Sequence, residues 1–191
     1  MRILLLPAAL LAIAANDGEI DPLSVDIGQA LDCKLDARTY NGFAFQLQDP
    51  ALGWKKRGWK PVRSGNPYLS EYILPKSVTI AGYRTNRIAF SAGAVLAVLD
   101  EPDPARVGAA LGVSNQAAGA AQTLGLPADL AAAVPKTGKF LGEAVVLDRK
   151  ERDETLGTTF HTRIARSVST VTSHPGKTLA GCAYSIAAED D

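Results

Sequence analysis

The sequence has few of the residues and none of the common motifs that announce catalysis or metal binding. It contains only two histidines and two cysteines. It has no G-x-S-x-G, H-E-x-x-H, S-x-x-K, Walker A or G-x-G-x-x-G pattern, so no activated nucleophile, zinc site or phosphate cradle is indicated. A zinc site would need His161 and His174 to converge with distant carboxylates across a strand and a turn. We therefore assign no catalytic, cofactor-binding or metal-binding residue and favour a non-enzymatic protein over an enzyme.

The chain also lacks an excess of charge of either sign. Its 20 Lys and Arg residues balance 20 Asp and Glu residues. A protein whose main partner is a polyanion usually has a strong positive field. Nucleic acid is therefore a disfavoured partner, and any anionic partner would have to bind a local basic patch.

No apolar run in the sequence is long enough to cross a bilayer, which takes about 20 residues. A shorter run from Ile3 to Leu11 follows Arg2, and Ala12 to Ala14 match the small-x-small pattern of a signal-peptide cleavage site. We expect residues 1–15 to be a secretory signal peptide. Residues 16–191 would then form a single exported domain, periplasmic or secreted, with no membrane span. The alternative is a buried first helix or strand.

Cys33 and Cys182 are the only cysteines. In an exported chain, an even number of cysteines usually forms disulfides. We therefore predict a disulfide that ties the N-terminal segment to the end of the chain. The alternative is a redox pair, but these residues lack the C-x-x-C spacing that lowers the pKa of a thiol.

Two short helices are predicted before the first strand. The first would begin at Asp21 and Pro22, which are typical of an N-cap and a first helical turn, and the second at Asp36. Apolar residues recur at helical spacing in both segments: Leu23, Ile27, Ala30 and Leu31 in the first, and Tyr40, Phe43, Ala44 and Leu47 in the second. These faces indicate burial against a sheet.

Six segments have the composition and alternation of β-strands. They are Tyr68–Leu74, Ser77–Ala81, Arg87–Leu99, Phe140–Leu147, Thr158–Thr172 and Thr178–Ile186. We expect Gly93 to bend the long third segment and Ser173 to Lys177 to form the last turn. The alternating charges from Asp148 to Glu154 indicate an exposed hairpin tip.

Between Asp100 and Thr137 the composition shifts to Ala, Gly, Pro and Leu. Asp103 and Pro104 are typical of a helix start, and Gly112 of a helix end. The fold class predicted is therefore α+β: a bent antiparallel sheet of about six strands, covered by the N-terminal helices and by this helical Ala/Gly-rich insert. The concave side of the sheet would either be filled by helices or hold a ligand, with the insert as a lid.

One segment interleaves aromatic and basic residues and is our candidate binding patch. It comprises Trp54, Lys55, Lys56, Arg57, Trp59, Lys60 and Arg63. Exposed rings in such a pattern stack on ligands while the cations neutralise phosphate or carboxylate, which would suit an anionic envelope component or another exported protein. The alternative, which we favour, is a solvated loop or edge whose tryptophans pack inward.

These observations favour an exported non-enzymatic binding module, or envelope-associated module, with an unidentified ligand. The competing hypothesis is a small exported hydrolase with its site in the concave face of the sheet. A cleft that gathers His161 or His174 with a carboxylate and a nucleophile would favour the hydrolase.

Overall fold

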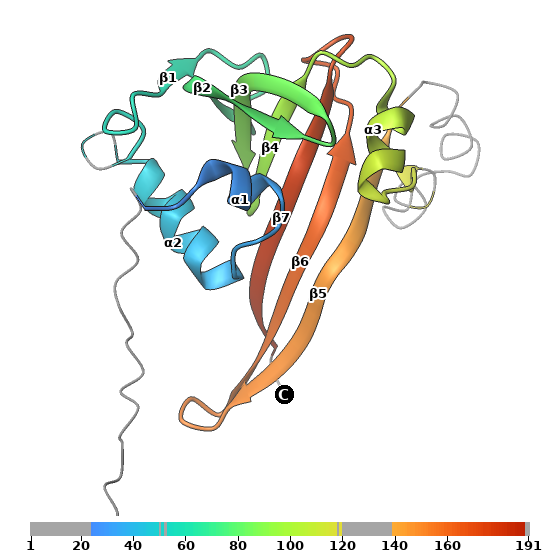
Figure 1. The fold of residues 1–191 in the computed structure, drawn as a ribbon. Helices are drawn as coiled ribbons and strands as arrows, with labels where there is room; N and C mark the ends of the chain where they lie inside the picture. The colour runs from blue at the N-terminus through green and yellow to red at the C-terminus, as the bar shows by residue number, and fades with distance from the viewer. Residues whose placement is uncertain (1–23, 50, 52, 118, 120–138, 190–191) are drawn as a thin grey trace, which may run out of the picture.

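Figure 1 shows the computed structural model of the protein. The structure describes residues 24–49, 51, 53–117, 119 and 139–189. The expected signal peptide, the helix start at Asp21 and Pro22, and most of the Ala/Gly-rich insert lie outside the described residues.

The described part of the chain is built on one antiparallel sheet of seven strands in the order β1-β2-β3-β4-β7-β6-β5. The strands are β1 (Lys60–Val62), β2 (Ser70–Ile80), β3 (Tyr83–Ser91), β4 (Ala94–Leu99), β5 (Leu141–Asp153), β6 (Thr158–Ser169) and β7 (Thr178–Glu189). The predicted α+β class with an antiparallel sheet is confirmed, whereas the predicted count of about six strands is one short and several strand boundaries differ.

The predicted single strand Arg87–Leu99 is wrong, because the chain reverses at Gly93. Ser91 pairs with Ala94 across a two-residue loop, and Gly93 has φ 73°, a conformation that glycine adopts without strain. Such a loop shifts the alternation of side chains by one position. Val95 therefore shares the face of Phe90, whereas Leu96 and Val98 point to the opposite face.

Two other strand predictions also need correction. Strand β2 continues through Pro75, which lies where the pairing of β2 with β3 is irregular, between Ile73 and Val78. Strand β5 does not end at Leu147, because the charged run pairs with β6 as far as Asp153. The alternating charges did indicate exposure, but they belong to a strand that is wet on both faces.

Three helices in the described part begin where side chains cap them. Helix α1 (Ile27–Leu31) is capped by Asp26, five residues after the predicted start. Helix α2 (Ala37–Leu47) is capped by Asp36 and helix α3 (Pro104–Leu111) by Asp103, both as predicted. None of the helices in the described residues is long and apolar enough to cross a membrane.

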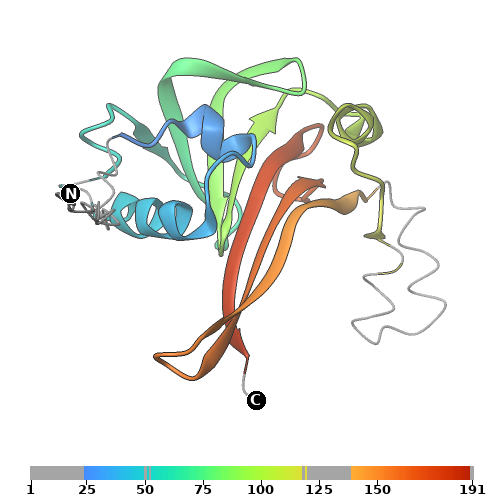
Figure 2. The same cartoon turned by 60° about the horizontal axis from the view of Figure 1, so that its bottom comes forward.

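The sheet curves around α1 and α2, which lie against its concave face (Figure 2). The centre of this main core is a cluster of buried rings: Tyr40, Phe43, Trp59, Tyr72, Phe90 and Tyr184. A disulfide between Cys33 and Cys182 joins the end of α1 to β7, with the two Cα atoms 5.3 Å apart. The opposite face of the sheet has a smaller core around Leu96, Val98 and Leu179, against which Val171 of the β6–β7 connection packs.

Candidate functional site

A hollow of about 910 Å³ lies between the start of α2 and one end of the long strands. This end comprises the last part of β5, the first part of β6 and the last part of β7, near the β5–β6 turn. Its apolar lining residues are Ala37, Leu147, Phe160 and Ile186. Its charged lining residues are Asp36, Arg38, Arg149, Glu151, Arg152 and Asp153. The volume is in the range of small-molecule sites, about 300–1,000 Å³.

The hollow exists because the long strands extend beyond the helices that cover them (Figures 1 and 2). On β6, Ile164 is buried in the main core, and Phe160, four residues earlier on the same face, lines the hollow. On β7, Tyr184 is buried in the core, and Ile186 is 38% exposed. The apolar stripe of the core face thus continues into a region that no described helix covers.

The acidic side chains at the hollow are occupied by local donors. Asp36 caps α2: its Oδ1 accepts from the backbone N–H of Thr39 at 2.8 Å, and its Oδ2 accepts from the Thr39 hydroxyl. Burial raises the pKa of Asp36, but these hydrogen bonds outweigh it, and the pKa lies below its ordinary value. Asp153 Oδ1 accepts from the N–H groups of Thr155 at 2.9 Å and Leu156 at 3.1 Å.

Two of the three arginines at the hollow, Arg38 and Arg149, are held less firmly. Arg149 pairs with Glu151 at 3.0 Å, and both side chains are more than half exposed, at 56% and 59%. Arg38 is exposed and forms no ion pair with another residue that the structure describes. Exposed ion pairs contribute about 0–1 kcal/mol, so a ligand can replace them at little cost.

The hollow offers binding groups but not the groups of a serine or cysteine hydrolase. Its described lining contains no Ser, Cys or His. The predicted hydrolase site in the concave face would need a nucleophile activated by an adjacent base. The one hydroxyl in the described lining, that of Thr162, has no hydrogen bond to a base among the described residues.

The candidate patch around Trp54 and Trp59 is not an exposed aromatic platform. Trp59 is 5% exposed, and the centre of its ring lies 6.4 Å from the ring centre of Phe43 and 5.9 Å from that of Tyr72. Trp54 is half-buried beside Tyr72. The buried ring of Trp59 is therefore not available to stack on a ligand, whereas Trp54 is covered only in part.

The cations of this patch divide into structural and exposed groups. The Arg57 guanidinium lies 4.8 Å from the ring centre of Phe43 and donates to the carbonyl of Val25 at 2.9 Å. Lys55 lies 5.5 Å from the ring centre of Trp54. Lys55, Lys56, Lys60 and Arg63 are all exposed. The alternative of inward-packed tryptophans thus describes Trp59 fully and Trp54 in part, and anion binding by the lysines stays a prediction.

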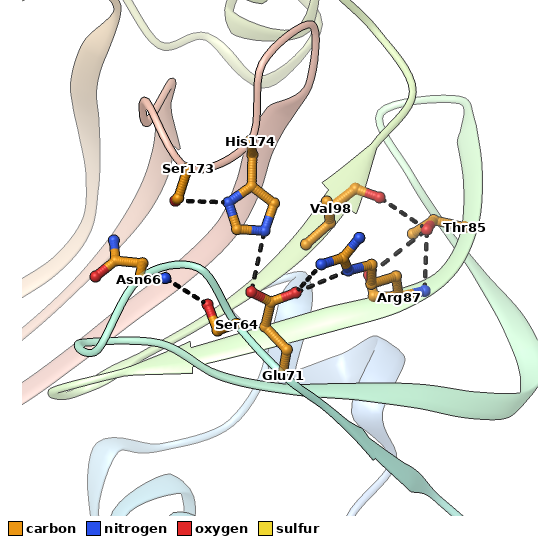
Figure 3. A network of polar contacts seen from close by, with 8 residues as sticks. All are labelled: Ser64, Asn66, Glu71, Thr85, Arg87, Val98, Ser173 and His174. Atoms are coloured by element: carbon orange, nitrogen blue, oxygen red, sulfur yellow. Dashed lines mark hydrogen bonds and ion pairs between the residues drawn. The ribbon is translucent and has the colours of Figure 1, made fainter.

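A buried polar network lies on the opposite face of the sheet (Figure 3). The fully buried carboxylate of Glu71 on β2 accepts from Arg87 Nε of β3 at 2.7 Å, and its other oxygen lies 3.0 Å from Nε2 of His174. Ser173 Oγ is 2.9 Å from Nδ1 of His174. Sequence reasoning had treated His174 as an ordinary turn residue and had not singled out Glu71, because only the fold brings these distant positions together.

The network gives Glu71 a stable charge. Burial alone would raise the pKa of this carboxyl. Hydrogen bonds from Ser64, Arg87 and His174, together with the charge of Arg87, lower the pKa by more than burial raises it, so the pKa lies below its ordinary value. Glu71 therefore stays ionised and ties β2, β3 and the β6–β7 turn together.

The other histidine has a different setting. His161 Nε2 lies 2.7 Å from Asp148 Oδ1 on the neighbouring strand, and its side chain is 29% exposed. No three His, Cys, Asp or Glu side chains gather into a metal-binding group anywhere in the described ranges.

In comparisons with known proteins, no family model, no curated protein and no solved structure matches the chain.

Proposed function

We propose that the protein is an exported, non-enzymatic binding module, periplasmic or secreted, and that the hollow between α2 and strands β5 to β7 binds its ligand. The observation that carries this proposal is the lining of the hollow. An apolar floor from Leu147, Phe160 and Ile186 lies beside two arginines. Arg38 has no ion pair with a described residue, and the ion pair of Arg149 is exposed; the described lining has no serine, cysteine or histidine. Small-molecule sites typically combine apolar walls with a few polar groups that fix orientation.

Two further observations support the exported location. The apolar run Ile3 to Leu11 followed by small residues is typical of a signal peptide. The disulfide between Cys33 and Cys182 is a bond that persists in oxidising compartments and is rare in the cytosol.

The binding role can be tested with the protein recovered from the exported fraction of its own host. Ile186→Trp would fill the hollow, whereas Ala187→Trp places the same side chain on the next, exposed residue of β7, which points to the opposite face. Small molecules extracted from wild type and both variants would be compared by mass spectrometry. We expect a molecule that is retained by wild type and Ala187→Trp and lost from Ile186→Trp. A molecule retained equally by all three proteins would contradict the proposed site.

A hydrolase remains the second candidate because of one observation, the contact chain Ser173–His174–Glu71. Three features make it the weaker candidate: His174 has a side chain 3% exposed, Glu71 is already paired with Arg87, and the hollow described above includes none of these residues. If the chain is catalytic, the wild type should cleave activated esters and Ser173→Ala should not. Equal and negligible rates for the two proteins would exclude this chemistry for such substrates.

A further inference from the structure

We infer that the hollow takes a single-chain amphiphile with an anionic headgroup, of the class of a medium- or long-chain carboxylate. This inference rests on the proposed function, since it assumes that the hollow is a binding site. It commits to one molecule bound as a monomer, because the volume of about 910 Å³ suits one small ligand and not a bilayer surface.

The apolar half of the ligand is indicated by the strand faces. Phe160 of β6 and Ile186 of β7 continue the stripe that Ile164 and Tyr184 bury in the core. Leu147 of β5 pairs with Ile164 and extends the same surface to the third strand. A chain of methylene groups on this floor would remove apolar area from water, which favours binding roughly in proportion to the area covered.

The charge of the headgroup is indicated by which charged lining groups can still form an ion pair or hydrogen bonds with a ligand. Formally the six charged lining residues balance, but both carboxylate oxygens of Asp36 and Oδ1 of Asp153 already accept hydrogen bonds from their own turns, and Glu151 pairs with Arg149. The guanidinium of Arg38 has no ion pair with a described residue, and that of Arg149 has only an exposed one. Arg38 therefore offers donors that no described carboxylate occupies, whereas each acidic lining residue has a local partner, which favours an anion over a cation. Guanidinium groups bind carboxylates in a bidentate manner.

Titration calorimetry with four probes separates the contribution of the ligand's alkyl chain to binding from the contribution of its headgroup charge. Decanoate has both features, acetate has the charge alone, 1-decanol has the chain alone, and decyltrimethylammonium has the chain with the opposite charge. We expect decanoate, below its micelle concentration, to bind with one-to-one stoichiometry and more tightly than the other three. Tighter or equal binding of decanol or of the cation would overturn the inference.

Variants of the intact protein locate the two ends of the ligand. Arg38→Ala should weaken decanoate binding by about 10- to 100-fold, the loss expected when one charge-assisted hydrogen bond is removed. Phe160→Ser should weaken the binding of decanoate without creating affinity for acetate. Arg84→Ala, at an exposed arginine of β3 outside the lining, is the matched control and should bind as wild type does. Equal affinities of Arg38→Ala and Arg84→Ala would overturn the headgroup assignment. Circular dichroism would check that each variant is folded.

Further outcomes distinguish a free anion from a membrane surface, and a wrong ligand class from a wrong binding site. Binding to phosphatidylglycerol vesicles with no binding of monomeric decanoate would overturn the inference in favour of a membrane surface. If decanoate does not bind, but a molecule extracted from wild type is absent from Ile186→Trp, then the ligand class is wrong and the hollow is still a binding site. If neither is seen, both proposals fail.

Discussion

Trp59 illustrates how the surroundings of one residue decide what its segment does. Its ring lies in a cluster with Phe43, Tyr72 and Phe90, and only 5% of the residue is exposed. The interleaved aromatic and basic residues around Trp59 predicted a candidate binding patch, but the pattern of residue types does not show which way the indole points. That direction is set by packing against α2 and β3, which come from other parts of the chain.

Trp59→Ala should lower the free energy of unfolding by about 3 to 5 kcal/mol, because it removes a buried ring and leaves a cavity. The double variant Lys55→Ala/Lys56→Ala changes two exposed side chains in the same segment and should stay within about 0.5 kcal/mol of wild type. Urea denaturation followed by circular dichroism measures both. A Trp59→Ala protein as stable as the lysine variant would show that the indole is not part of the core.

Glu71→Gln should lower the free energy of unfolding by about 3 kcal/mol or more, because it leaves Arg87 and His174 beside a buried neutral group. Glu143→Gln is a suitable control. Its carboxylate also pairs with an arginine, Arg163, at 2.7 Å, but both side chains are about one-third exposed, at 35% and 33%. Partly exposed pairs contribute about 1 kcal/mol or less. Equal losses in the two variants would contradict the special role of the buried network.

The same carboxylate predicts how stability changes with pH. Because the pKa of Glu71 is lower in the folded than in the unfolded chain, its contribution is present above the unfolded value of about 4.3 and is lost as the pH falls through the folded value. Wild type should therefore lose stability below about pH 4.3 more steeply than Glu71→Gln does. Parallel curves of urea midpoint against pH would rule this out.

At the scale of helices and strands, the elements with local signals were predicted well. Helices α2 and α3 begin at Asp36 and Asp103, whose side chains cap the backbone N–H groups a few residues later. Helix α1 is capped by Asp26, whereas the predicted start at Asp21 and Pro22 lies outside the described residues. The β3–β4 reversal was missed because alternation of apolar residues continues through a two-residue loop.

Gly93→Ala tests that reversal. Gly93 has φ 73°, and an added Cβ would lie 2.8 Å from the carbonyl oxygen of Tyr184 on β7. Gly82→Ala is the matched control, since Gly82 has φ 82° but no heavy atom within 4 Å of the added Cβ. Both variants should incur the strain of about 1 to 2 kcal/mol for a left-handed alanine, and Gly93→Ala an additional loss from displacing β7. Equal losses in thermal unfolding would mean that the close approach at Gly93 has no energetic consequence.

At the scale of the whole molecule, the sequence predicted the class of fold and the pairing of its cysteines, but not the hollow. The hollow results from a difference in length: β5, β6 and β7 extend beyond α2, and no local pattern encodes that difference. The buried network was missed for a related reason, since Glu71, Arg87 and His174 are brought together by the order β2-β3-β4-β7 in the sheet.

Mass mapping of the protein recovered from the exported fraction tests its processing and its crosslink together. We expect a chain that lacks residues 1 to about 15 and contains a peptide pair joined through Cys33 and Cys182. The double variant Cys33→Ala/Cys182→Ala should be about 2 to 5 kcal/mol less stable, yet folded, because a chain of this size has a hydrophobic core of its own. An N-terminus at Met1, or two free thiols, would contradict the proposed export and oxidation.

The hollow between α2 and the ends of β5, β6 and β7 that lie near the β5–β6 turn is the proposed ligand site. The most direct measurement is a crystal structure of the protein purified without denaturation from its host's exported fraction and supplemented with decanoate. We expect density along Phe160 and Ile186 that ends in an anionic group at Arg38. Ordered water alone in the hollow, with decanoate bound elsewhere or not at all, would contradict it.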